Sequence, residues 1–232
     1  MKYKMISKLV VLVIGIFVGS VTIQANETAE HAIDNDIEEV SEKFIDYFGS
    51  VFLNFKNVTV LDLNGNDITN DFYNKNIVNY NNNDFSSIKT YVNREVSEVF
   101  IDESNVNLEK LKTERSPFVS CPISKRYYKV IRHEQANGEI EYYLSGSFVW
   151  DRATSIITSI GAASIRISHV SFGARWAHAT TNMSTSSYLT ASNTVANFKG
   201  SFNIVATYKI GFITIYNETI QFSKSFSSYP FG

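Results

Sequence analysis

The stretch that decides the fold is residues 125–150, KRYYKVIRHEQANGEIEYYLSGSFVW, in which two strand-like runs flank Asn137-Gly138. An Asn-Gly pair between β-rich runs is a strong hairpin signal, because both residues of a tight two-residue turn need a positive φ. We therefore predict a hairpin that reverses at this pair, with one apolar face shared by both strands. The predicted partners are Ile131 with Leu144, His133 with Tyr142 and Tyr127 with Phe148.

The chain after Pro117 continues in the same strand-like manner. Apolar and polar residues alternate from Phe202 to Ile210, and the 232 residues include only three prolines. Several short strands separated by turn signals are typical of antiparallel sandwiches and open barrels. We predict a mostly antiparallel β-sandwich or open barrel over 116–232. Its further strand-like runs are 156–160, 164–172, 188–198, 201–210 and 212–223.

The preceding residues, 26–115, predict a small helix-containing segment with an acidic N-terminal arm, which makes the fold class α+β. Residues 36–55 carry apolar side chains at spacings of three and four, as an amphipathic helix requires. Asp34 or Asp36 is the expected cap of this helix, and its acidic first turn suits the helix dipole.

The rest of this segment predicts one further helix and two short strands. Asp84 is placed to cap a helix over 85–95. Residues 70–83 are rich in Asn, whose side chain competes for backbone hydrogen bonds, and they predict a loop. Strands are expected at 58–63 and 96–101, and the charged residues 102–116 are the best candidate for a boundary.

The N-terminus has the order of a secretory signal peptide. Lysines at positions 2, 4 and 8 are followed by the apolar run LVVLVIGIFVG of residues 9–19 and by a short segment that ends at Ala25. This order predicts that residues 1–25 are removed by cleavage after Ala25. An uncleaved anchor is the alternative, but the run is shorter than the roughly 20 residues that span a bilayer. We expect a secreted, extracellular protein without a stable membrane anchor after cleavage.

Charge and cysteine content narrow the functional classes. The formal net charge is −2, so no electrostatic argument favours nucleic acid as a partner. Cys121 is the single cysteine, which excludes a disulfide within the chain. Its expected role is that of a small buried apolar residue. A disulfide to another chain and a nucleophilic thiol paired with one of the histidines are the alternatives.

No sequence motif specifies a reaction or a cofactor. His133-Glu134 lacks the second histidine that a zinc-protease helix carries four residues after the first. His169 and His178 can meet on neighbouring strands and are the candidate metal ligands, although no acid or thiol partner is evident. We assign no catalytic residue and expect no cofactor.

Two features point instead toward binding. Trp150, Trp176 and Tyr188 are candidates for an aromatic platform that contacts sugar rings or a protein, although such residues also fill β cores. Residues 184–194, STSSYLTASNT, are rich in Ser and Thr and alternate weakly. Such segments can form membrane-inserted hairpins of pore-forming toxins, but apolar positions are too sparse here for a clear lipid-facing side. An exposed edge strand or a long loop is the expected structure.

The order of signal peptide, helix, the turn NGNDIT at 64–69, second helix and β-rich tail is similar, in a generic way, to secreted proteins of Gram-positive bacteria. This resemblance implies the compartment and assigns no residue a role. The leading hypothesis is a non-catalytic extracellular β-sandwich that binds a protein or a glycan. A secreted membrane-active toxin or antimicrobial factor is the first alternative, based on residues 36–55 and 184–194. An extracellular hydrolase with a site assembled in space is the second.

Overall fold

The computed structural model describes residues 40–106, 116–132, 137–173, 175–190 and 192–230. Residues Ser41–Gly232 form one compact unit. The described part of this unit holds three α-helices and nine strands in two sheets. This content confirms the predicted α+β class with a helical segment before a β-rich region. The predicted signal peptide and acidic arm lie outside the described residues.

The larger sheet, sheet A, consists of β1 (Val58–Asp62), β2 (Val96–Asp102), β3 (Phe118–Arg132), β4 (Asn137–Asp151), β5 (Ile156–Ile160) and β6 (Ser164–Phe172). Its order is β1-β2-β3-β4, and both β5 and β6 pair with β4. All of these pairings are antiparallel. β2 and β3 pair across the predicted boundary between the segment 26–115 and the domain 116–232, and that division stays a prediction because residues 107–115 are not described.

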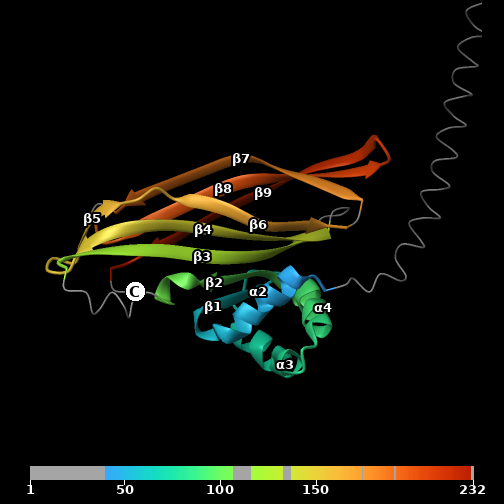
Figure 1. The fold of residues 1–232 in the computed structure, drawn as a ribbon, viewed down its shortest axis with the longest axis horizontal. Coiled ribbons are helices and arrows are strands. Elements are labelled where there is room, and N and C mark those ends of the chain that lie inside the picture. Colours follow the sequence, from blue (N-terminus) through green and yellow to red (C-terminus); the bar gives the residue numbers. More distant parts are fainter. Residues whose placement is uncertain (1–39, 107–115, 133–136, 174, 191, 231–232) are drawn as a thin grey trace, which may run out of the picture. The chain divides into compact units, whose positions relative to one another are not determined.

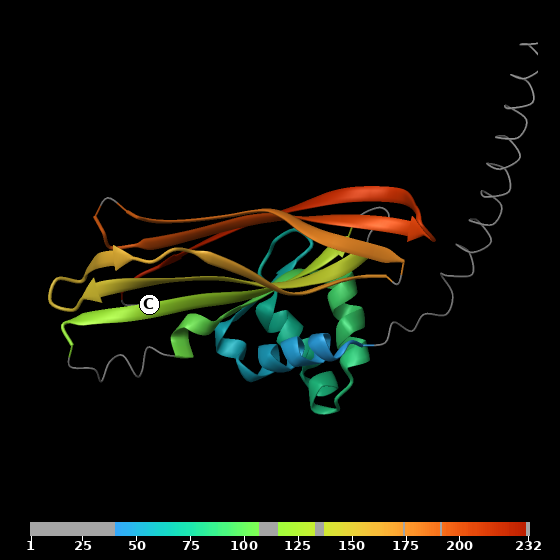
Figure 2. The ribbon, with the colours of Figure 1, turned by 45° about the horizontal axis from the view of Figure 1, so that its top comes forward.

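The smaller sheet, sheet B, consists of β7 (Trp176–Leu189), β8 (Ala196–Ile210) and β9 (Ile213–Ser228), in that order. It packs on one face of sheet A, as Figures 1 and 2 show. The layer between the sheets is mostly apolar and aromatic, and it also holds the bond between Lys224 of β9 and Glu98 of β2. Tyr142 of β4 contacts the rings of Phe202 and Phe222 at centroid distances of 5.1 and 6.2 Å. This face-to-face arrangement is a sandwich whose core is built from the inward residues of both sheets.

Helices α2 (Glu42–Leu53), α3 (Thr69–Asn81) and α4 (Phe85–Glu95) cover the other face of sheet A (Figure 1). Tyr47 of α2 is fully buried, and its hydroxyl donates to the carbonyl oxygen of Val99 in β2 at 3.0 Å. Tyr128 of β3 packs against Phe44 and Phe48 of α2, with ring centroids 6.0 and 5.1 Å apart. Where the helices lie, sheet A is therefore covered on both faces, whereas Phe118, Ser120 and Pro122 at the start of β3 are exposed.

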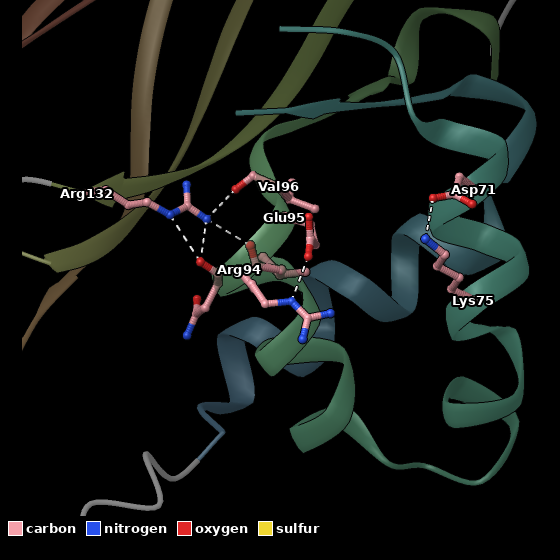
Figure 3. Close-up of polar contacts among 8 residues, drawn as sticks. Asp71, Lys75, Arg94, Glu95, Val96 and Arg132 are labelled. Atoms are coloured by element: carbon pink, nitrogen blue, oxygen red, sulfur yellow. Dashed lines mark hydrogen bonds and ion pairs between the residues drawn. The ribbon is translucent and has the colours of Figure 1, made fainter. Parts of the chain in front are cut away.

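Arg132, the last residue of β3, ties the end of α4 to sheet A (Figure 3). Its guanidinium donates to the carbonyl oxygens of Val92, Asn93 and Val96 at 2.7–3.1 Å. A helix leaves its last carbonyl groups without helical partners, and a cation near this end also suits the helix dipole. The other two ion pairs in Figure 3 are exposed and contribute little to stability.

The first helix is shorter than the predicted span of 36–55. α2 begins at Glu42, and its cap is Ser41, whose Oγ accepts a hydrogen bond from the Phe44 amide at 3.1 Å. The predicted acidic caps lie outside the described residues. The predicted apolar face is confirmed where it is described, because Phe44, Phe48 and Val51 are buried.

The loop predicted over residues 70–83 is wrong, because most of these residues form α3. Phe72 is fully buried and stacks on Phe52 of α2 at 5.6 Å, while the Asn76 amide donates to the Phe72 carbonyl oxygen. Packing of this face outweighs the weak helix propensity of Asn. The helix at 85–95 is confirmed together with its cap, since the Asp84 carboxylate accepts from the Ser87 amide.

The reversal predicted at Asn137-Gly138 is also wrong. Both residues belong to β4, and Gly138 pairs with Ile131. Tyr127 faces Tyr142 rather than Phe148, which is a shift of six residues. An even shift keeps every side chain on its predicted face, so the shared apolar face is confirmed while the partners are not. Gly138 does not form a turn but lets β6 approach β4 closely, because a Cβ there would lie 2.3 Å from the Ser171 carbonyl oxygen of β6.

The strand predicted over 188–198 is interrupted by a turn. Tyr188 ends up in β7 and Phe198 in β8, and the Thr190 amide donates to the Val195 carbonyl oxygen between them. Asn193 adopts a positive φ of 51°, which Asn tolerates better than most residues. The first half of 184–194 is therefore an exposed edge strand, as predicted, and the second half turns into β8.

Candidate functional site

A layer of buried charged groups lies between the helices and sheet A. Glu139 of β4 accepts a hydrogen bond from the Tyr128 hydroxyl, and its Oε1 lies 3.5 Å from Nε2 of His169 in β6. Burial opposes ionisation of Glu139. The His169 side chain beside the carboxyl, the hydrogen bond from Tyr128 and the charge of Lys89 outweigh that effect, and they hold the pKa of the Glu139 carboxyl below its usual value.

Arg126 and Glu141 form a second buried pair in the same layer. Arg126 Nε lies 2.9 Å from Glu141 Oε1, and the guanidinium sits over the rings of Tyr47 and Tyr143 at 4.8 and 5.7 Å. Burial works against the charge of Arg126, but the bond to Glu141 overrides it and raises the pKa of the guanidinium. A pair of this kind is costly to break, because either partner alone is left as an uncompensated buried charge.

A pocket of about 310 Å³ opens beside Arg126. Most of its lining residues carry polar side chains, but the cation at its wall is already neutralised by Glu141 and donates to Ser50 Oγ at 3.4 Å. The pocket therefore offers an anion little net attraction. The lining residues are Ser50, Asn54, Asn57, Ile101, Asp102, Glu103 and Arg126.

The two candidate metal ligands lie in different sheets. His169 of β6 pairs with Glu141 in sheet A and faces Glu139, whereas His178 of β7 pairs with Ala206 in sheet B. His178 lies beside the Phe172 ring at 6.2 Å. No group of three or more His, Cys, Asp or Glu residues in the described part of the chain is arranged to hold a metal ion. Metal binding by these histidines stays a prediction. The structure adds one acid, Glu139 beside His169, as a further candidate ligand.

The three aromatic candidates do not form one platform. Trp150 packs against the core from the end of β4, opposite Val119 of β3. Trp176 begins β7, and Tyr188 lies near its other end with 58% of its surface exposed. Twelve residues of strand separate these two by about 40 Å. A ligand role for any one of them remains a prediction, and Cys121 is buried as expected.

The strongest candidate for a contact surface is one that the sequence argument missed, at the turn between β8 and β9. Ile210 pairs with Ile213 across Gly211 and Phe212. Gly211 has a φ of 59°, which is the positive value that the first position of a type II′ turn needs. We name residues 210–215 the hairpin tip. Phe212 is fully exposed there, and Ile210, Ile213 and Ile215 are 45%, 67% and 54% exposed.

Aromatic side chains with polar ends follow directly behind the hairpin tip. Trp176, Tyr208 and Tyr216 form what we call the aromatic collar, with Trp176 at 5.4 Å from Tyr208 and 6.0 Å from Tyr216. Two cations lie beside it: Arg175 Nη1 is 3.5 Å from the Tyr208 hydroxyl, and Lys209 is exposed at the next position. Along the hairpin the order is therefore apolar tip, aromatic collar, then core.

The sequence signal for this surface is the run KIGFITIY at residues 209–216. Apolar residues stand directly on both sides of the Gly211-Phe212 turn, and Lys209 and Thr214 pair next to them. An apolar run is also normal for a buried strand, so the sequence alone does not separate the two. Only the placement of the turn at a free end of the hairpin, visible in Figures 1 and 2, shows that these side chains are uncovered.

Comparisons of this protein with protein-family models, with curated proteins and with solved structures give no match. Among the described residues, the helices are all too short or too polar to cross a membrane.

The lowered pKa of Glu139 predicts a specific loss of stability in acid. The ionised carboxylate stabilises the fold above the pKa of an unfolded carboxyl, and this contribution disappears as the pH falls through the lowered folded-state pKa. In urea unfolding followed by circular dichroism, Glu139→Gln should be less stable than the wild type near pH 7, and the difference should shrink toward about pH 3. The exposed Asp46→Asn change is the control. A Glu139→Gln deficit that is constant with pH would refute this account.

Proposed function

We propose that this protein is a secreted, non-catalytic binding protein whose contact surface is the hairpin tip. The observation that carries this proposal is the full exposure of Phe212 among three further exposed isoleucines. Contiguous apolar surface on a folded protein marks an interaction site more often than chance exposure of single residues does. The tip is contiguous because Ile210 and Ile213 face each other across the turn.

The buried acids of the protein support a structural role for its charged layer. Glu139 is bonded to Tyr128 and Glu141 to Arg126 in this layer, and on the other face of sheet A Glu98 of β2 is bonded to Lys224 of β9. Each carboxylate thus has a partner inside the fold, as buried charges in stable proteins usually do. These acids stabilise the packing of the layers. The exposed hairpin tip is therefore the better-supported contact surface.

The chemistry of the hairpin tip bears on the kind of partner. Glycans are recognised through dense hydrogen bonding together with ring stacking, and the tip side chains Ile210, Phe212, Ile213 and Ile215 carry no hydrogen-bonding group. An apolar partner surface fits the tip better than a sugar. The membrane-active alternative based on residues 36–55 loses support, because the apolar face of α2 is buried against β3.

Secretion predicts a defined mature N-terminus. When the full chain is expressed in a Gram-positive host, the protein recovered from the medium should begin at Asn26, because the charged and apolar order of residues 1–25 matches a cleavable signal. Intact-mass measurement tests this. The variant Ala25→Phe, which places a bulky residue at the cut, should retain residues 1–25. Wild-type protein that stays in the cells with an intact N-terminus would contradict secretion.

The contact surface predicts tip-dependent retention on cells. Labelled protein is incubated with intact bacterial and animal cells, and the bound fluorescence is measured after washing. The double variant Phe212→Ser/Ile213→Ser should lose most of the retention, because burying each of these side chains contributes about 1.5–3 kcal/mol. Leu53→Ser is the matched control, since Leu53 is 77% exposed on α2.

Two results would refute the tip as the contact surface. One is retention of the double variant at the wild-type level, and the other is the absence of wild-type retention on every cell type tested. Equal urea midpoints of the two proteins establish that the double variant is folded, which is expected because both side chains are exposed.

A further inference from the structure

We propose that the partner of the hairpin tip is the surface of a phospholipid bilayer, into which the tip inserts as far as the aromatic collar. This inference deepens the proposed function and depends on the tip being the contact surface. It follows from the shape of the tip, from the state of its backbone, and from the order of side chains along the hairpin.

The tip presents its apolar side chains at the narrow end of a two-residue turn. Gly211 and Phe212 form the turn, and the strands pair again directly at Ile210 and Ile213. The apolar surface is therefore convex. A protein partner would have to supply a matching pocket for it, whereas the fluid acyl chains of a bilayer can close around any shape. An apolar projection of this form fits a lipid surface without a preformed receptor.

The backbone of the hairpin limits how deep the tip can go. Pairing of Lys209 with Thr214 and of Ile210 with Ile213 satisfies the inward backbone groups of both strands. The Lys209 amide still donates outward to the Arg175 carbonyl oxygen at 3.2 Å. Nearer the turn, the outward groups of a two-stranded ribbon lack a neighbouring strand and must stay near water, because unpaired backbone groups are too costly in hydrocarbon. The geometry therefore points to insertion at the boundary between headgroups and acyl chains and not to a membrane-spanning strand.

The side chains behind the tip match the depth profile of that boundary. Tyr208 precedes Ile210 by two residues on the same face of β8, a distance of about 7 Å along a strand. Interfacial elements bury their apolar side about 5–10 Å, which places the aromatic collar at headgroup level. Trp and Tyr favour this level because their rings are apolar and their polar ends reach water and headgroups.

Charge at the collar favours phosphate-bearing lipid. Arg175 and Lys209 are exposed beside the collar, and both reach the level at which phosphates lie. The nearest acid on this face, Glu218, is buried one step further from the tip and interacts with the Tyr216 hydroxyl at 3.3 Å. Each cation near an anionic surface contributes roughly 1 kcal/mol to binding. Anionic bilayers should therefore bind the protein more tightly than neutral ones.

The outer edge of β7 offers no comparable site. Asn182 adopts a positive φ of 53° where the β7–β8 register shifts between Thr181 and Ser184. A bulge in an edge strand twists it away and blocks the addition of another strand. The edge is thus protected from pairing with another chain, while the tip is not covered.

The proposal is tested by co-sedimentation with protein-free vesicles of phosphatidylcholine alone and of phosphatidylcholine mixed with phosphatidylglycerol. We expect the exported protein to bind both, and the mixed vesicles more tightly. Phe212→Ser/Ile213→Ser should weaken binding by about a hundredfold, because each of the two apolar side chains contributes about a factor of ten. Lys209→Gln should reduce the preference for the mixed vesicles, and Leu53→Ser should bind like the wild type. All variants share one N-terminus, so any contribution of residues 1–25 cancels.

The remaining outcomes overturn the proposal in distinguishable ways. Wild-type protein that binds neither vesicle, or a double variant that binds like the wild type, contradicts lipid insertion by the tip. Tip-dependent retention on cells without vesicle binding leaves the proposed function standing and makes the partner a protein. A wild-type dimer in sedimentation velocity that the double variant converts to monomer, without vesicle binding, makes the tip an interface between copies of this chain.

Discussion

The contact between the two sheets is the constraint on which the rest of the structure depends. The ring of Phe198 in β8 lies against Gly146 in β4, so closely that a Cβ on Gly146 would be 2.1 Å from the ring. A Cβ on Gly200 would likewise be 2.5 Å from Ile165 in β6. Each of the two glycines thus leaves room for a side chain of the opposite sheet, Phe198 of β8 at Gly146 and Ile165 of β6 at Gly200. This packing fixes the position of sheet B, and with it the place where the β8–β9 hairpin leaves the core.

The part of sheet A that holds the first half of β4 is covered on both faces, and this cover explains where the charged residues of that strand go. Glu139 and Glu141 alternate with Ile140 and Tyr142, and all four side chains are buried. The even-numbered residues enter the apolar layer under sheet B, while the acids enter the layer under the helices and are matched by Arg126, Tyr128 and His169. Hydrogen-bonded acids of this kind fix the orientation of the side chains around them, which apolar contacts alone would not do. Outside these layers, the hairpin tip gathers four exposed apolar side chains at one turn.

The sequence predicted the features that depend on the alternation of side chains along a strand. It did not predict the features that depend on contacts between residues distant in sequence. The face occupied by Tyr127 and Tyr142 follows from alternation alone, so it was predicted even though the partners were six residues out of register. Gly138 was assigned to a turn because its close neighbour, Ser171, is distant in sequence. The helix around Asn76 depends on Phe72 meeting Phe52 of another helix. Exposure of Phe212 depends on where the core ends, which no local pattern encodes.

The most direct test of this account is the free energy of unfolding of Gly146→Ala, measured by urea denaturation beside Gly49→Ala. Overpacking against the Phe198 ring should lower the value for Gly146→Ala by about 1–3 kcal/mol. Gly49 lies in α2 with open space around it, so its change to Ala should instead raise stability by up to about 1 kcal/mol. If Gly146→Ala is as stable as the wild type, the sheets do not meet at this glycine, and the position assigned to the hairpin loses its physical basis.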